Sequence, residues 1–81
     1  MSARRRARAQ AIQALGAFLE GLDDTLRECF ILSELEQMTA PEVAAATGAN
    51  LHTVHSRIRT ARQLFEQMVA RRRARDPWSR P

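Results

Sequence analysis

Residues 39–62 constrain the fold of this chain more than any other stretch. Thr39, followed by Glu42 three positions later, forms the capping-box pattern that begins many helices. Gly48 suits the left-handed backbone conformation that commonly ends a helix. Asn50 then suits the N-cap of a second helix, because its side chain can accept a hydrogen bond from the first turn. The stretch therefore predicts a short helix, a glycine turn and a longer helix, which together form a helix-turn-helix.

The second helix of this motif has the most regular apolar pattern in the chain. Apolar side chains recur at spacings of three and four residues, at Leu51, Val54, Ile58, Ala61, Phe65 and Met68. This spacing places them on one face of an amphipathic helix. We expect the helix to continue to about Arg75 and to be ended by Pro77.

Two more helices are predicted before the motif. One covers about residues 10–22, with an apolar stripe at Ile12, Leu15, Leu19 and Leu22. The other covers about residues 24–36 and is apolar on two sides, at Leu26, Cys29 and Phe30 and at Ile31, Leu32 and Leu35. We expect it to be mostly buried, the alternative being a patch for a partner.

No alternating strand pattern occurs, so the predicted fold class is all-α: a small four-helix domain with a C-terminal helix-turn-helix and no wing. We expect residues 10–75 to form the domain. Residues 1–9 are predicted to be a basic start that is flexible or a frayed helix, and residues 76–81 a disordered tail.

The distribution of charge indicates two kinds of partner. All 13 basic residues are arginines against 9 acidic residues, for a net charge of +4 among 81 residues. The arginines crowd the start and the second half of the chain, and most acidic residues lie between Glu20 and Glu42. This asymmetry favours a polyanion on one face and a protein contact on another.

Several other classes of function are not expected. A chain this short forms one small core without a deep substrate cavity, and no nucleophile–base pair, acid pair or phosphate loop is present, so we do not predict an enzyme. The single Cys29 excludes an internal disulfide, and His52 and His55 lack a third ligand nearby, so neither metal nor cofactor is expected. No apolar stretch approaches the roughly 20 residues of a membrane span, which favours a cytoplasmic protein.

The outer face of the longer motif helix suits DNA. Opposite the apolar stripe lie His52, Ser56, Arg59 and Gln63, and no carboxylate occurs on this face before Glu66. Acidic groups there would be repelled by phosphates, and the first turns of a recognition helix contact the bases. We expect base contacts from His52, His55 and Ser56, a guanine or phosphate contact from Arg59, and phosphate contacts from Thr53, Arg57 and Arg62.

From about Gly21 to Met68 the chain resembles region 4, the C-terminal domain of bacterial RNA polymerase sigma factors, with the extracytoplasmic-function group nearest. The most specific part follows Gly48 and reads Thr53-Val54-x-Ser56-Arg57-Ile58-x-x-Ala61-Arg62. The resemblance implies recognition of the −35 promoter element, docking on the flap of the polymerase β subunit and, often, capture by an anti-sigma factor. It also implies base-facing positions at Leu51, His52, His55 and Ser56, and backbone or docking positions at Thr53, Arg57 and Arg62. Helical geometry instead puts Leu51 nearer the core.

Three departures from the family pattern bear on function. His55 stands where a basic residue or tyrosine is common in the family, so the base preference stays open. Thr47 replaces a usual leucine, which should weaken packing of the first motif helix. The promoter-melting domain is missing, so we expect a fragment of a sigma factor or a stand-alone regulator that does not initiate transcription alone.

Two alternatives to the sigma-type function stay open. The first is another class of helix-turn-helix regulator, such as a response-regulator output domain that dimerises on a palindrome. The second is an interaction module that docks through Phe30–Leu32.

Overall fold

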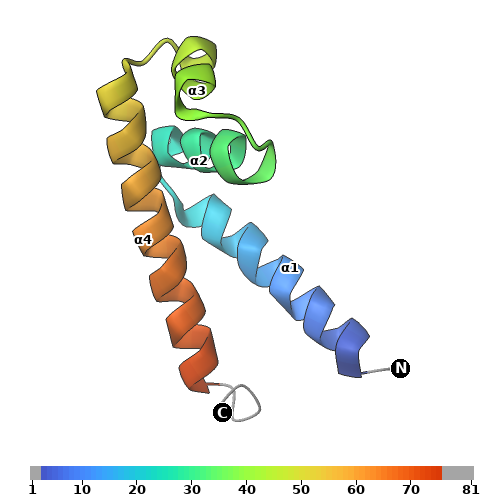
Figure 1. Cartoon of the computed structure of the whole chain (residues 1–81). Coiled ribbons are helices and arrows are strands. Elements are labelled where there is room, and N and C mark those ends of the chain that lie inside the picture. Colours follow the sequence, from blue (N-terminus) through green and yellow to red (C-terminus); the bar gives the residue numbers. More distant parts are fainter. Residues whose placement is uncertain (1–2, 76–81) are drawn as a thin grey trace.

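The computed structural model describes residues 3–75 and is helical almost throughout (Figure 1). Within this range there is no strand, and the predicted all-α class with four helices is confirmed. The elements are α1 (Ala3–Gly21), α2 (Asp24–Phe30), a π-helical segment η1 (Ile31–Leu35), α3 (Ala40–Thr47) and α4 (Leu51–Arg75).

The longest helix, α4, runs along one side of an elongated molecule of 45 × 23 × 21 Å. α2 and α3 pack against its first half, and α1 diverges from its second half, so that the start of α1 and the end of α4 lie at the same end of the molecule (Figure 1). The helix-turn-helix, formed by α3 and the start of α4, occupies the opposite end.

Two apolar clusters hold the helices together. The first joins α2, α3 and α4 through the buried Cys29, Val43, Val54 and Ile58. The second joins α1, α2 and α4 through Leu22, Phe30 and Ala61, with Leu15, Phe18, Leu19, Leu26 and Phe65 packed against them. The predicted inward positions of Val54, Ile58 and Ala61 on α4 are confirmed.

Three phenylalanines form the centre of the second cluster. The rings of Phe18, Phe30 and Phe65 lie 5.5 Å apart between centroids in each pair, two of the pairs edge-to-face. Phe18 was not part of the apolar stripe predicted for the first helix. Ile12 was part of that stripe, but it is 64% exposed. Because α1 diverges from α4, its second half packs and its first half does not.

Arg27 fixes the point at which α1 ends. Its Nε donates a hydrogen bond to the Leu19 carbonyl at 2.8 Å, and its Nη2 donates to the Leu22 carbonyl at 3.0 Å. The Leu19 carbonyl also accepts from the Leu22 N–H at 3.2 Å, and a cation near the end of a helix suits the helix dipole. The guanidinium pairs with Asp24 as well, at 3.1 Å. The corner between α1 and α2 therefore depends on an arginine that the sequence reading did not single out.

Two helices differ in extent or type from the prediction. The first begins at Ala3 rather than near Gln10, so the helical option for the basic start holds over residues 3–9, which is consistent with the strong helix propensity of alanine and arginine. The predicted helix over residues 24–36 is an α-helix to Phe30 followed by the π-helical η1. Its expected burial fails at Leu35, which is 51% exposed.

The predicted tail, residues 76–81, lies outside the described residues, as does Pro77. The proposed domain bounds of 10–75 stay a prediction.

Candidate nucleic-acid interface

The start and end of α3 are defined by the predicted caps. The Thr39 N–H donates to Glu42 Oε1 at 2.7 Å, and the Glu42 N–H donates to Thr39 Oγ1 at 3.3 Å. Two hydrogen bonds to the Glu42 carboxylate, first from the Thr39 N–H and then from the Thr39 side chain, hold the pKa of the Glu42 carboxyl below its usual value. Gly48 adopts φ 78°, and its N–H donates to the Ala44 carbonyl at 2.9 Å. The predicted capping box and glycine stop are both confirmed.

The turn into α4 is held by side-chain hydrogen bonds. The Thr53 N–H donates to Asn50 Oδ1 at 2.8 Å, as predicted for an N-cap. Thr47 Oγ1 donates to the Val43 carbonyl at 2.8 Å and accepts from the Ala49 N–H at 3.4 Å. A leucine at position 47 could make neither bond, and Val43 is fully buried despite the smaller neighbour. These contacts orient the first turns of α4 relative to α3.

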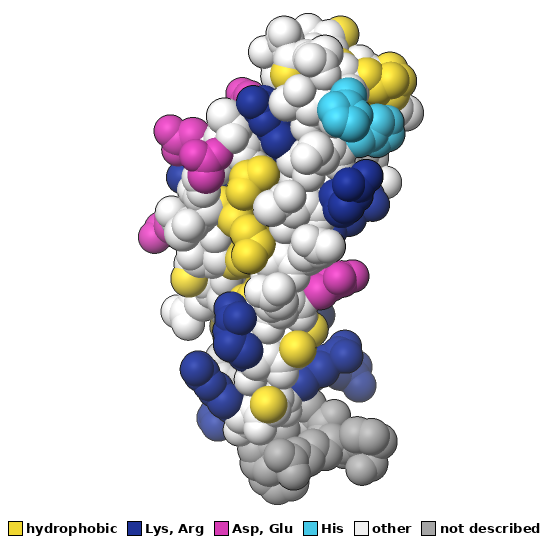
Figure 2. All heavy atoms as spheres, turned by 90° about the vertical axis from the view of Figure 1, so that its left-hand side faces the viewer, with side chains coloured by type: hydrophobic (Ala, Val, Ile, Leu, Met, Phe, Trp, Pro, Cys, Tyr) yellow, Lys and Arg dark blue, Asp and Glu magenta, His cyan; other side chains and the backbone are white. Residues whose placement is uncertain are grey.

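The first half of α4 exposes a polar face without acidic residues. His52, His55, Ser56 and Arg59 are exposed, while Val54 and Ile58 on the opposite side are buried. Figure 2 shows the histidines near the helix-turn-helix end of the molecule, with a basic group and then an acidic group further along the same side, and other acidic side chains on the opposite side of this view. This arrangement agrees with the orientation that helical geometry predicted.

Two further candidate residues lie at the edge of this face. Thr53 and Arg57 are partly buried. Hydrogen bonds from the Thr25 hydroxyl and the Leu26 N–H are the main causes that lower the pKa of Asp23, the N-cap of α2, and the charge of Arg57 adds a smaller contribution.

Leu51 is at the surface. It is 43% exposed at the first position of α4, so the geometric expectation that it lies near the core was wrong. The buried part of the apolar stripe of α4 begins one turn later, at Val54. An exposed Leu51 agrees with the outward position that the family resemblance implied.

A model of sigma-70 region 4 matches residues 12–65. The chain belongs to the sigma-70 region 4 family. The matched range contains the second half of α1, both core clusters and the complete helix-turn-helix. No curated protein and no solved structure matches the chain. Assignment to the extracytoplasmic-function group within the family stays a prediction.

In this region 4 domain, Arg62 has a partner that no sequence pattern indicates. Its Nε donates to Oε1 of Glu34, an η1 residue 28 positions away. The Arg62 side chain is 58% exposed and the Glu34 side chain 32%. The pair joins α4 to η1 at the edge of the polar face. Since no local pattern relates the two residues, the contact arises from tertiary packing.

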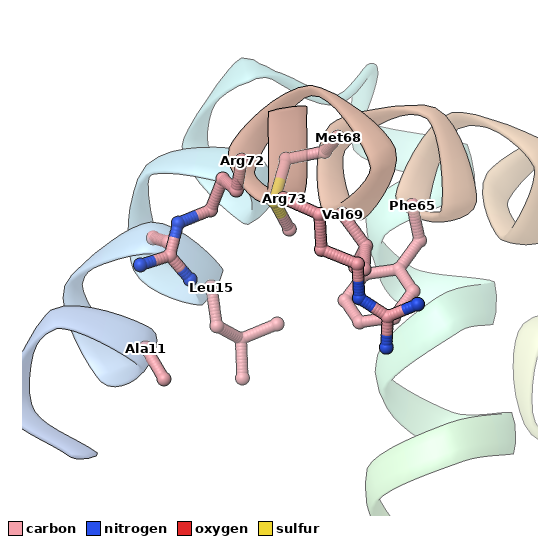
Figure 3. A pocket seen from close by; sticks show the side chains of 8 residues that line it. Ala11, Leu15, Phe65, Met68, Val69, Arg72 and Arg73 are labelled. Carbon is pink, nitrogen blue, oxygen red and sulfur yellow. The ribbon is translucent and has the colours of Figure 1, made fainter. Parts of the chain in front are cut away.

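The second half of α4 forms an open groove with α1. Its volume is about 430 Å³, and its lining is apolar except for Arg72 and Arg73, whose guanidinium groups extend to either side of the groove (Figure 3). The other lining residues are Ala11, Ala14, Leu15, Phe65, Met68 and Val69. An apolar floor between arginines suits an amphipathic segment with acidic residues. Phe30, which the interaction-module alternative needs at the surface, is buried instead.

Other kinds of site are not found in the described residues of this region 4 domain. Between residues 3 and 75, no group of three or more His, Cys, Asp or Glu side chains is arranged to hold a metal ion. Over the same residues, no helix combines the length and the apolar character needed to cross a membrane.

Proposed function

We propose that this region 4 domain binds duplex DNA at the −35 promoter element through the exposed face of α4. The observation that carries the proposal is the acid-free polar face of His52, His55, Ser56 and Arg59, on a helix whose opposite side is buried. The major groove admits an α-helix and presents a distinct hydrogen-bonding pattern for each base pair. A helix capped and oriented by the α3–α4 turn can enter that groove with its first turns.

Each candidate residue has a role in this proposal. His52, His55 and Ser56 contact base edges, and Arg59 donates to a guanine or a phosphate. The exposed Leu51 contacts a thymine methyl group, which is the kind of base feature an aliphatic side chain recognises. Phosphates are contacted by Thr53, Arg57 and Arg62.

The proposal predicts sequence-dependent DNA binding by the isolated chain. A fluorescently labelled duplex, selected from a random library for binding, is titrated with the chain, and its anisotropy is compared with that of a scrambled duplex. We expect the selected duplex to bind roughly 10-fold tighter or more, with absolute affinity limited by the small size of one module. Affinity should fall with salt at a log–log slope of about −0.9 for each phosphate contact. Equal affinity for the two duplexes would contradict promoter recognition.

We further propose that the groove between α1 and α4 docks on the flap of the polymerase β subunit. The support is the accessible apolar lining of Leu15, Met68 and Val69 beside Arg72 and Arg73. This groove lies at the end of the molecule away from the helix-turn-helix, so DNA and polymerase can be bound together. An anti-sigma factor that occupied the groove would compete with the polymerase; that role stays a prediction.

The docking proposal is tested with Val69→Asp. A carboxylate in the apolar groove must be desolvated when the partner binds, so we expect affinity for an isolated β-flap domain to fall roughly 10-fold or more. The matched control is Gln67→Asp, which adds the same charge on α4 at an exposed position outside the groove lining. Isothermal titration calorimetry measures both. Equal affinities of the two variants for the flap would contradict docking in this groove.

A further inference from the structure

The guanidinium of Arg62 is held by a carboxylate at the edge of the proposed DNA-binding face. Arg62 belongs to α4, and its partner Glu34 belongs to η1. Both line a polar pocket of about 390 Å³ that also includes His55, one of the proposed base-contacting residues. The Arg62 guanidinium is therefore already bonded to a carboxylate. This bond lies close to where the phosphate backbone of bound DNA would be.

At the neighbouring start of α3, two backbone donors are already used within the capping box. The N–H of Thr39 already donates to Glu42, and the N–H of Glu42 donates to Thr39. The capping box thus uses these donors at the start of α3. Arg62 supplies the positive charge of the pocket, and Glu34 compensates it.

Carboxylates and phosphates use the same donors of an arginine. The Arg62–Glu34 pair is open to solvent, with side chains 58% and 32% exposed, so screening makes it easy to break. Duplex DNA presents a dense row of phosphates, and a carboxylate beside that row is repelled. A DNA phosphate can therefore displace the Glu34 carboxylate from Arg62. As long as Glu34 stays in place, its negative charge opposes DNA binding.

We propose that Glu34 is an internal competitor of DNA for Arg62. When α4 docks on DNA, a backbone phosphate replaces the Glu34 carboxylate on the guanidinium, and Glu34 turns to solvent. The carboxylate thereby lowers the DNA affinity of the domain and couples the position of η1 to DNA binding. The inference rests on the proposed DNA-binding function.

The test is Glu34→Gln, with Glu36→Gln as matched control. Both variants remove one negative charge from the same segment, but Glu36 is exposed and makes no ion pair with Arg62. We expect Glu34→Gln to tighten binding to the selected duplex roughly 3- to 10-fold at low salt, because a repulsive charge is removed and Arg62 is released. Its salt slope should steepen by about 0.9, the value for one added phosphate contact. Glu36→Gln should change affinity less than about twofold, as expected of a screened surface charge.

Arg62→Ala supplies the second arm of the experiment. If Glu34 acts mainly through Arg62, the Glu34→Gln gain in the Arg62→Ala background should shrink to less than about twofold, the effect of removing a screened surface charge, and a double-mutant cycle detects this loss. Thermal unfolding of each variant verifies that the fold is retained.

Two results would overturn this inference while leaving the proposed DNA binding intact. One is weaker DNA binding by Glu34→Gln, which would make Glu34 a positioning residue for Arg62. The other is an equal gain in DNA affinity from Glu34→Gln and Glu36→Gln. Absence of DNA binding by the wild-type chain and every variant would refute the proposed function, and the inference with it.

Discussion

Replacing Phe30 by alanine is expected to destabilise the domain by about 3–5 kcal/mol, the usual cost of removing a buried phenylalanine. Phe30 is 4% exposed, and its ring contacts Phe18 of α1 and Phe65 of α4. The whole stability of a small domain is about 5–15 kcal/mol, so a large part of it depends on this ring. Urea unfolding followed by circular dichroism at 222 nm measures the loss, and much of the population should be unfolded without denaturant.

Ile12→Ala is the matched control for the Phe30 experiment. It also shortens an apolar side chain, but Ile12 is 64% exposed on the part of α1 that diverges from α4. We expect a change of about 0.5 kcal/mol or less, as for other surface substitutions. An unfolding midpoint for Phe30→Ala equal to that of the wild type would show that the three phenylalanines do not hold α1, α2 and α4 together.

Arg59→Ala is expected to weaken binding to the selected duplex by about 1–3 kcal/mol, the value of one good arginine contact to a base. Arg59 is exposed on the acid-free face of α4, one turn after His55 and Ser56. If Arg59 contacts guanine, the preference for the selected duplex over the scrambled one should narrow. If it contacts a phosphate, both affinities should fall together. Fluorescence anisotropy with the two duplexes separates these outcomes.

Arg8→Ala controls for the loss of charge. Arg8 is an exposed arginine on the first half of α1, outside the residues matched by the family model. Its replacement lowers the net charge by the same amount at the end of the molecule away from the helix-turn-helix. We expect a much smaller effect on DNA affinity than that of Arg59→Ala. If the two variants lost equal DNA affinity, Arg59 would act only through long-range electrostatic attraction and not through a direct contact.

The helix-turn-helix was predictable because its interactions are local. The capping box joins Thr39 to Glu42, and Asn50 bonds to Thr53, each over three residues. Gly48 is needed for one backbone conformation, at φ 78°, which a residue type by itself can indicate. Along α4, the 3.6-residue period determined which side would be buried, and with it which side faces outward.

The first helix shows where such patterns become insufficient. Ile12, Leu15, Leu19 and Leu22 share a spacing that fits one stripe, yet Ile12 is exposed and Phe18 packs in the core. The spacing of apolar residues predicts which face of a helix is apolar. It does not predict over what length another helix packs against that face. That length depends on the angle between α1 and α4, which no local pattern gives.

Local patterns were sufficient to predict the helical class, the motif with its caps and the outward face of α4, since these depend on residues within a few positions of one another. Three other features are visible only in the folded chain: the cluster of Phe18, Phe30 and Phe65, the groove between α1 and α4, and the pairing of Arg62 with Glu34. These features join elements distant in the sequence. Their formation depends on how whole helices cross, which the free energy of packing selects and no local pattern encodes.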